Sequence, residues 1–232
     1  MIEYLDSVDK SLLVMMNGDG NTYWDQIMWM FTGRVIWLPI ILAFLTYFFR
    51  KGGWKETLMV LVAIALVITF ADQFASTFCK PFFERLRPSR EPELEGIVNL
   101  VNNFKASKYG FISSHAANGI GFAVFSSLLI RKSFYTFTIF FWALITGYTR
   151  IYLGVHYPGD ILFGSLAGAF FGYLVYVIYD WAHSYMYEFF HLRSRRIPYK
   201  GEMPTEVIAG LYIIYALMLT IPSILYPIFM TH

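Results

Sequence analysis

The chain is poor in the residues on which soluble proteins depend. Only 15% of its 232 residues are charged, whereas about 25% are charged in a typical soluble domain. A chain of this length therefore lacks the polar side chains needed to cover a globular surface. The formal net charge of +2 offers no broad basic surface for nucleic acid. The single cysteine, Cys79, excludes an intramolecular disulfide and a cysteine-based metal cluster.

Long apolar segments make up most of the sequence. Hydrophobic residues account for 57% of the chain and aromatic residues for 20%. Many aromatic residues flank the apolar runs, as Trp and Tyr do at membrane interfaces. Since a helix needs about 20 residues to cross the hydrocarbon core, we predict six membrane-spanning helices, near residues 26–49, 54–78, 115–130, 134–151, 160–182 and 206–229. We therefore expect an all-α, polytopic membrane protein in which residues 1–232 form a single domain.

The N-terminal segment, residues 1–21, has a different pattern. Within it, residues 2–16 place apolar side chains on one helical face and acidic ones on the other. This pattern predicts a short amphipathic helix, either in the membrane interface or packed on the protein. The segment is more acidic than basic and does not resemble a cleavable signal peptide. We expect the first apolar span to direct membrane insertion.

Basic residues in the short loops predict the orientation, because such loops remain in the cytoplasm. They lie between the first and second, third and fourth, and fifth and sixth spans: Arg50, Lys51, Lys55, Arg131, Lys132, Arg193, Arg195, Arg196 and Lys200. The connections at 79–114 and 152–159, and both termini, are then extracytoplasmic. Oligomeric state and the role of the 183–205 loop stay open. His183 and His191 are expected at the cytoplasmic interface.

A stripe of small residues marks the fifth predicted span. Gly164, Gly168 and Gly172 recur at steps of four residues. Such a stripe lets two helices approach closely. We predict that it packs against another helix of the same bundle, in preference to forming a homodimer interface.

Ionisable side chains stand at the ends of the apolar spans on the predicted outer face. Such groups are costly at membrane depth and by default mark a functional site. They fall into three clusters: Lys80 with Arg87 and Pro88, then Ser113, Ser114 and His115, then Thr149 and Arg150 with His156 and Asp160. Three permanent cations, two imidazoles and one carboxylate suit an anionic substrate that needs a nucleophile and a proton donor. A phosphate ester fits.

Elementary chemistry supports this interpretation. Ser113 and Ser114 precede an apolar helix and are good N-cap candidates. The first backbone N–H groups of that helix could bind an anion. Lys80, Arg87 and Arg150 could surround a phosphoryl group and stabilise the charge on its oxygens.

The three clusters together resemble the type-2 phosphatidic acid phosphatase (PAP2) family of integral membrane lipid phosphatases. Its signature is K-x6-RP, then PSGH, then SR-x5-H-x3-D, and this sequence matches its order and spacing. The resemblance covers roughly residues 25–182. The sequence departs from the signature at Ile112 and Ser114, which replace Pro and Gly, and at Thr149, which replaces Ser. None of these changes removes a titrating or cationic group.

The resemblance implies a six-helix bundle of the PAP2 type and a role for each matched residue. His156 would be the nucleophile that forms a phosphohistidine, and Asp160 would fix its tautomer. His115 would protonate the leaving oxygen and then activate water. The phosphate would be bound by Lys80, Arg87, Ser113, Ser114 and Arg150. No metal or other cofactor is implied.

The implied substrate is a lipid phosphate in the bilayer. Lipid A phosphate and undecaprenyl diphosphate are preferred, and phosphatidylglycerol phosphate and phosphatidic acid remain alternatives. Monophosphate and diphosphate substrates are not distinguished. The implied location is the bacterial inner membrane, with the site facing the periplasm.

Other interpretations of the same residues compete with this one. Lys80 and Arg87 could be interfacial anchors, and His115, His156 and Asp160 could form a metal site. A protein that binds or transports anionic lipid without cleaving it would also carry intramembrane cations. Against that class, a binding site has no use for a histidine–carboxylate pair beside a second histidine, and the sequence has no detectable inverted repeat.

Arg34 and Asp72 lie outside the three clusters. Counted along the first two predicted spans, both fall at a similar depth. We predict an ion pair between them. Asp72 also shares a helical stripe with Ser76 and Lys80, so it could orient the site instead.

Overall fold

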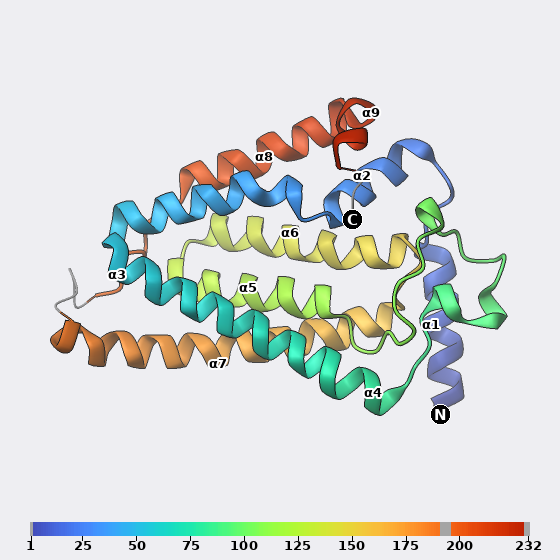
Figure 1. Ribbon diagram of the computed structural model, residues 1–232, viewed down its shortest axis with the longest axis horizontal. Coiled ribbons are helices and arrows are strands. Elements are labelled where there is room, and N and C mark those ends of the chain that lie inside the picture. Colours follow the sequence, from blue (N-terminus) through green and yellow to red (C-terminus); the bar gives the residue numbers. More distant parts are fainter. Residues whose placement is uncertain (1, 191–195, 230–232) are drawn as a thin grey trace.

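The computed structural model describes residues 2–190 and 196–229. Its regular elements in this part of the chain are helices, with one isolated β-bridge between Leu86 and Tyr109. Figure 1 shows the long helices running side by side along one axis. These are α3 (Leu38–Gln73), α5 (Ser114–Ile130), α6 (Ser133–Tyr152), α7 (Pro158–Phe190) and α8 (Thr205–Thr220).

The bundle has the apolar character of a membrane protein. Two stretches, Val35–Phe83 and Pro158–Tyr187, are long and apolar enough to cross a bilayer, and the bent pair Thr205–Thr220 and Pro222–Ile228 provides a third if it counts as one span. Large apolar side chains are exposed on the outer surfaces of these helices, including Leu166 and Phe170 of α7. A surface of this kind is suited to lipid.

The first predicted span is wrong at its N-terminal end. Helix α2 (Thr22–Thr32) ends at Gly33, the 3₁₀ turn η1 (Val35–Trp37) follows, and only then does α3 begin. Gly33 is extended, with φ −67° and ψ 155°, and a proline opens α3. The apolar side chains continue across this break, so hydrophobicity alone does not reveal it.

The predicted boundary between the first two spans coincides with a sharp bend at Gly53. Its φ of 77° lies in the left-handed region that glycine adopts without strain. Figure 1 shows that the two halves of α3 run in opposite senses on either side of this bend. The second half continues through a π-helical segment, η2 (Phe74–Cys79), into α4 (Lys80–Phe83). This continuous path carries Lys80 to the end of the bundle.

Predicted helices 115–130 and 134–151 match α5 and α6 within one residue at each end. Helix α7 runs to Phe190, beyond the predicted end at 182. The last predicted span is broken after Thr220, where the chain bends by 96° into α9 (Pro222–Leu225) and η6 (Tyr226–Phe229). Pro222 cannot continue the hydrogen-bonding pattern of the preceding helix, which accounts for the break.

Helices α5 and α7 are in unusually close contact through the glycine stripe. A Cβ atom at Gly168 would collide with the backbone carbonyl of Ala117, and one at Gly172 with that of Gly121. At Gly164 it would lie 2.6 Å from the Ser113 carbonyl oxygen. The predicted packing inside one bundle is confirmed.

Helix α1 (Ile2–Met16) crosses the end of the bundle, near the loop that precedes α5 (Figure 1). Leu13 is fully buried in a cluster with Leu94, Ile151 and Tyr157. Asp6 and Asp9 of α1 turn toward the protein, as described below. An apolar stripe on the same helix is exposed: Leu5, Val8, Leu12 and Met15.

The predicted ion pair between Arg34 and Asp72 is wrong. Within the described residues these two side chains form no salt bridge, and Asp72 accepts a hydrogen bond from Ser76 at 3.3 Å. The break after α2 places Arg34 outside a helix, on the exposed surface. Counting residues along a continuous span therefore gave the wrong position.

The far end of the bundle contains a buried polar pair. His183 of α7 lies 3.1 Å from the Glu56 carboxylate of α3, and each residue is at most 1% exposed. This contact joins α3 to α7. His183 is therefore buried between helices near this end of the bundle, its position relative to the membrane interface stays a prediction, and His191 lies outside the described residues.

Candidate active site

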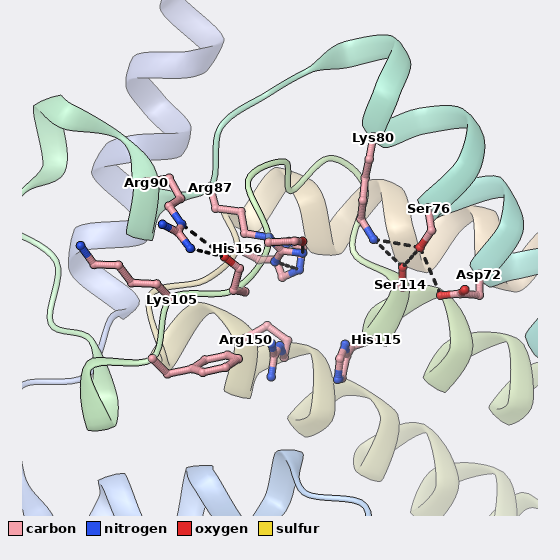
Figure 2. Close-up of a pocket in the computed structure, with 13 residues that line it drawn as sticks. Asp72, Ser76, Lys80, Arg87, Arg90, Lys105, Ser114, His115, Arg150 and His156 are labelled. Atoms are coloured by element: carbon pink, nitrogen blue, oxygen red, sulfur yellow. Dashed lines mark hydrogen bonds between the residues drawn. The ribbon is translucent and has the colours of Figure 1, made fainter. Parts of the chain in front are cut away.

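The three sequence clusters converge at one end of the bundle, around a cavity of about 590 Å³. Its lining includes the following predicted residues: Lys80, Arg87, Ser114, His115, Arg150 and His156. Figure 2 shows them projecting from different elements toward a common space. Residues separated by more than seventy positions thus form one cationic site.

His156 and Asp160 form a buried pair at the start of α7. His156 Nδ1 lies 3.1 Å from Asp160 Oδ2, and both side chains are almost fully buried. The backbone N–H of Tyr157 also donates to Oδ2. Pro158 begins α7, so one turn of backbone connects the two groups. Asp160 does not line the cavity because it lies behind the imidazole.

Arg87 contacts the opposite side of the His156 ring. Its Nη1 lies 2.6 Å from His156 Nε2 and donates to the Val155 carbonyl at 2.9 Å. Its Nε donates to the Tyr109 carbonyl at 3.1 Å. A guanidinium can only donate hydrogen bonds. Nε2 is therefore the acceptor, and Nδ1 carries the proton directed at Asp160.

The charges around His156 favour its neutral form. Burial lowers the pKa of His156 well below 6.5, and the cations of Arg87 and Arg150 lower it further. Burial also lowers the pKa of Arg87 to about 10, although Asp160 acts in the opposite direction. Near neutral pH the site thus combines a neutral imidazole with protonated arginine.

Lys80 lines the cavity and belongs to a chain of hydrogen-bonded side chains. Its Nζ donates to Ser114 Oγ at 2.8 Å and to Ser76 Oγ at 3.1 Å. Ser76 in turn donates to Asp72 at 3.3 Å. Asp72 therefore reaches Lys80 through Ser76, which agrees with the alternative that placed it near the site.

The two serines before α5 have different environments. Ser113 is the N-cap, is fully buried, and accepts from the Ala116 N–H at 3.4 Å. Its side chain does not line the cavity, although it was predicted to bind phosphate. Ser114 lines the cavity beside Lys80. His115 follows in the first turn of α5 and also lines the cavity.

Arg150 lies near the end of α6 and lines the cavity. It is 6% exposed, and its Nη1 donates to Thr32 Oγ1 of α2 at 2.7 Å. The Arg150 carbonyl accepts from the N–H groups of Val155 and His156. Thr149 is buried, and its hydroxyl donates to the Thr146 carbonyl at 2.7 Å. Thr149 and Arg150 therefore fix both the Arg150 guanidinium and the loop that carries His156.

Arg85 belongs to the site but was not predicted from the sequence. This side chain reaches Asp160 Oδ1 at 3.1 Å, and it also contacts Asp6 and Asp9 of α1. The carboxylates of α1 are about eighty positions away in sequence, so no local pattern connects them to Arg85. The surplus of acids on an otherwise apolar N-terminal segment was the only signal.

Two further cations line the outer part of the cavity. Arg90 donates to the Ala106 carbonyl through Nε and Nη2, at 3.3 and 3.2 Å. Lys105 is exposed. In Figure 2, both lie on one side of His156, with Lys80 and Ser114 on the other. The outer loop thus extends the basic lining beyond the predicted residues.

The metal alternative has no geometric support among residues 2–190 and 196–229. No group of three His, Cys, Asp or Glu side chains in that part of the chain is placed to hold a metal ion. The oxygens of Asp160 face Arg85 and His156 Nδ1, so they do not converge with His115 on a common point.

Comparison with known proteins gives concordant matches. Residues 56–184 match the PAP2 superfamily. A lipid A 4′-phosphatase from Bacteroides thetaiotaomicron is 44% identical over 77% of this chain and 80% of that protein. A lipid A 4′-phosphatase from Porphyromonas gingivalis is 37% identical over 79% and 78%, respectively.

Two further matches have lower sequence identity. An undecaprenyl-diphosphatase from Sulfolobus acidocaldarius is 28% identical over 60% of this chain and 61% of that protein. The crystal structure of Aquifex aeolicus LpxE superimposes with a TM-score of 0.56, at 26% identity over 71% of this chain and 92% of that one.

Proposed function

The chain belongs to the PAP2 superfamily and is a lipid phosphate phosphatase, and from this premise we propose that it removes the 4′-phosphate of lipid A or a closely related glycolipid. The two lipid A 4′-phosphatases match more than three quarters of the chain. The undecaprenyl-diphosphatase is less similar and covers less of it. Undecaprenyl diphosphate is therefore the second candidate, ahead of the glycerolipids.

One observation carries the proposed mechanism: the hydrogen-bonded chain from Asp160 through His156 to the cationic cavity. Because Nδ1–H is directed at Asp160, the lone pair of Nε2 is directed at Arg87. A lone pair facing a cluster of cations is what attack on a bound phosphate monoester requires.

In the first step, Nε2 of His156 attacks phosphorus while the P–O bond to the sugar breaks. Lys80, Arg87 and Arg150 neutralise the phosphoryl oxygens, assisted by the Ser114 hydroxyl. His115 gives its proton to the leaving oxygen, and Asp160 stabilises the charge that develops on the His156 ring. The products are the dephosphorylated lipid and a phosphohistidine.

In the second step, water attacks the phosphohistidine. His115, now neutral, accepts a proton from the water, and the N–P bond breaks. Inorganic phosphate leaves, and both imidazoles return to their initial protonation states. Ser113 contributes as the cap of α5 and does not contact the phosphate.

The membrane arrangement is part of the proposal. Helices α5 and α6, the two halves of α3, α7 and α8 are taken as six spans, with the cavity at the periplasmic face of a bacterial inner membrane. Helix α1 then lies in the interface. Its exposed stripe of Leu5, Val8, Leu12 and Met15 supports this placement.

The test is phosphate release by the purified protein. Lipid A, undecaprenyl diphosphate, phosphatidylglycerol phosphate and phosphatidic acid are compared, and mass spectrometry identifies the phosphate lost from lipid A. We expect lipid A to give the highest kcat/KM, and His156→Ala to lower turnover by about 1,000-fold or more. Turnover that persists in the variant contradicts the mechanism. A higher kcat/KM for phosphatidic acid than for lipid A contradicts the proposed substrate. If the wild-type protein binds lipid but releases no phosphate, the result favours a non-catalytic lipid-binding protein.

Arg90 and Lys105, the two cations in the outer part of the cavity, provide a second test of the substrate. A glycolipid with another anionic group can reach Lys105 and Arg90, whereas phosphatidic acid has no second charge to offer them. We expect Lys105→Gln to raise KM for lipid A by about 2-fold to 5-fold, the size of an exposed ion pair, and to leave KM for phosphatidic acid unchanged.

Lys108→Gln is the matched control for this variant. Lys108 is an exposed lysine of the same loop that does not line the cavity. Equal effects of the two substitutions, or equal effects of Lys105→Gln on both lipids, contradict a role for Lys105 in recognising the glycolipid.

A further inference from the structure

We propose that Arg85 is a positioning residue, held by the N-terminal helix α1, that orients Asp160 and through it the His156 imidazole. The inference rests on the proposed roles of His156 and Asp160. It makes α1 part of the catalytic apparatus, although α1 does not line the cavity.

Arg85 joins three carboxylates from two elements. Its Nη1 donates to Asp9 Oδ2 at 2.8 Å and to Asp160 Oδ1 at 3.1 Å, and its Nη2 donates to Asp6 Oδ1 at 2.9 Å. The guanidinium also lies 4.0 Å from the centre of the buried Tyr157 ring. A planar cation held by directed hydrogen bonds and by stacking has little freedom to turn.

The contact with Arg85 completes the bonding of the Asp160 carboxylate. Oδ2 accepts from Tyr157 N–H and faces His156 Nδ1, each at 3.1 Å. Oδ1 accepts from Arg85. With both oxygens engaged, the carboxylate cannot rotate without breaking a charge-assisted hydrogen bond, and the direction of the imidazole is fixed with it.

The structure is built to bring α1 to this point. Asp9 Oδ1 accepts from the Gly159 N–H at 2.7 Å, in the first turn of α7. A Cβ atom at Gly159 would lie 2.7 Å from Asp9 Oδ2, so a larger residue there would push the Asp9 carboxylate away from this position. Asp9 therefore touches both Arg85 and the turn that carries Asp160.

The charges of this network are stable near neutral pH. Burial alone would lower the pKa of Arg85, but Asp160 and Asp9 raise it above its ordinary value. Burial alone would raise the pKa of Asp6, but hydrogen bonds from Lys10 and Arg85 bring it below its ordinary value. The charged groups that act on His156 are Arg85, Arg87, Arg150, Lys80 and Asp160. His115 is a further titratable group that interacts with it across the cavity.

The test measures kcat, KM and the pH profile of lipid dephosphorylation by Arg85→Gln, Arg85→Lys and Asp9→Asn. We expect Arg85→Gln to lower kcat by about 10-fold to 100-fold, the cost of a misplaced reacting group, with KM nearly unchanged. Arg85→Lys should recover part of the loss. Removing the Arg85 charge also raises the pKa of His156, so the acid limb should move to higher pH.

Glu93→Gln is the matched control. Glu93 forms an ion pair with Lys10 of α1 at 2.7 Å, is exposed, and does not touch Arg85. This variant should retain the kcat and pH profile of wild type. An equal loss in Glu93→Gln would indicate that α1 matters only for stability and would overturn the proposal.

Two further outcomes are decisive. A folded Arg85→Gln protein with unchanged kcat overturns the positioning role. If Arg85→Gln does not fold, the Asp9→Asn variant, which retains the arginine, is measured instead. An unchanged kcat and an unchanged acid limb in Asp9→Asn overturn the proposal. Wild-type protein that releases no phosphate contradicts the proposed function itself, whereas an active wild type with an equally active Arg85→Gln contradicts only this inference.

Discussion

At the scale of single residues, hydrogen-bond partners select the tautomer of His156. Asp160 accepts at Nδ1 and Arg87 donates at Nε2. In the proposed reaction Arg87 must transfer its hydrogen bond from Nε2 to a phosphoryl oxygen before attack. The same guanidinium thus marks the direction from which the phosphate approaches.

The pH dependence follows from the lowered pKa of His156. Because this pKa lies well below 6.5, the imidazole stays neutral and nucleophilic as the pH falls through 6.5. We expect the acid limb of kcat/KM for lipid dephosphorylation to lie below pH 6.5. The profile is measured by phosphate release in buffers of constant ionic strength.

The folding stability of the protein should also decrease at acid pH. Above pH 6.5 the unfolded chain gains no proton at this histidine, so the stability associated with neutral His156 is fully present. It is lost as the pH falls from 6.5 through the folded-state pKa. In the activity measurement, an acid limb of kcat/KM at or above pH 6.5 contradicts the assignment of His156 as the nucleophile.

Residue patterns along the sequence predicted part of the candidate site. Lys80, Arg87 and His156 were found because each stands in a motif with fixed spacing. Arg85 was missed because its carboxylate partners on α1 are distant in sequence. Ser113 was predicted both as an N-cap candidate and as a phosphate-binding residue, and the structure shows that it caps α5.

At the scale of elements, the contact between α5 and α7 depends on glycine. We expect Gly168→Ala to reduce the free energy of unfolding by about 1–3 kcal/mol, the usual cost of overpacking, because the new methyl group meets backbone that cannot move aside. Thermal unfolding of the detergent-solubilised protein measures the effect.

Gly119→Ala on α5 is the control for this substitution. A Cβ atom there would lie 3.7 Å from that of Ala143, an ordinary van der Waals contact. The control should unfold at the temperature of wild type. If Gly168→Ala is as stable as Gly119→Ala, the two helices are not held as close as described.

Helix boundaries were predictable where composition changes and unpredictable where it does not. The loop between α5 and α6 contains Arg131 and Lys132, which interrupt the apolar pattern. The break at Gly33 lies within a continuous apolar run, so the first span was drawn across it. Backbone conformation decides such a break, and hydrophobicity does not report it.

At the scale of the whole molecule, polar groups gather at the two ends of an apolar bundle. The cationic cavity occupies one end, and the Glu56–His183 pair is buried toward the other. Exposed apolar side chains cover the length between them. This distribution supports a transmembrane arrangement with the proposed reaction at the end that holds the cavity.

Cysteine labelling tests the proposed orientation. Cys79 is 3% exposed and is replaced by serine to give a background without thiols. We expect Lys108→Cys to react with a membrane-impermeant maleimide in intact spheroplasts, and Lys200→Cys to react only after permeabilisation. The reverse pattern would place the cavity on the cytoplasmic side and contradict the proposed orientation.

The backbone hydrogen bond from Ser113 N–H to the Asp160 carbonyl, at 3.0 Å, joins the starts of α5 and α7. Together with the glycine contacts, it sets the distance between the helix turn that bears His115 and the one that bears Asp160. The outer loop of Arg90 and Lys105 lies outside this joint. Exchanging residues 90–106 for the corresponding segment of a relative, while Arg85 and Arg87 of the same loop are retained, would therefore change the outer lining of the cavity on an unaltered reaction centre.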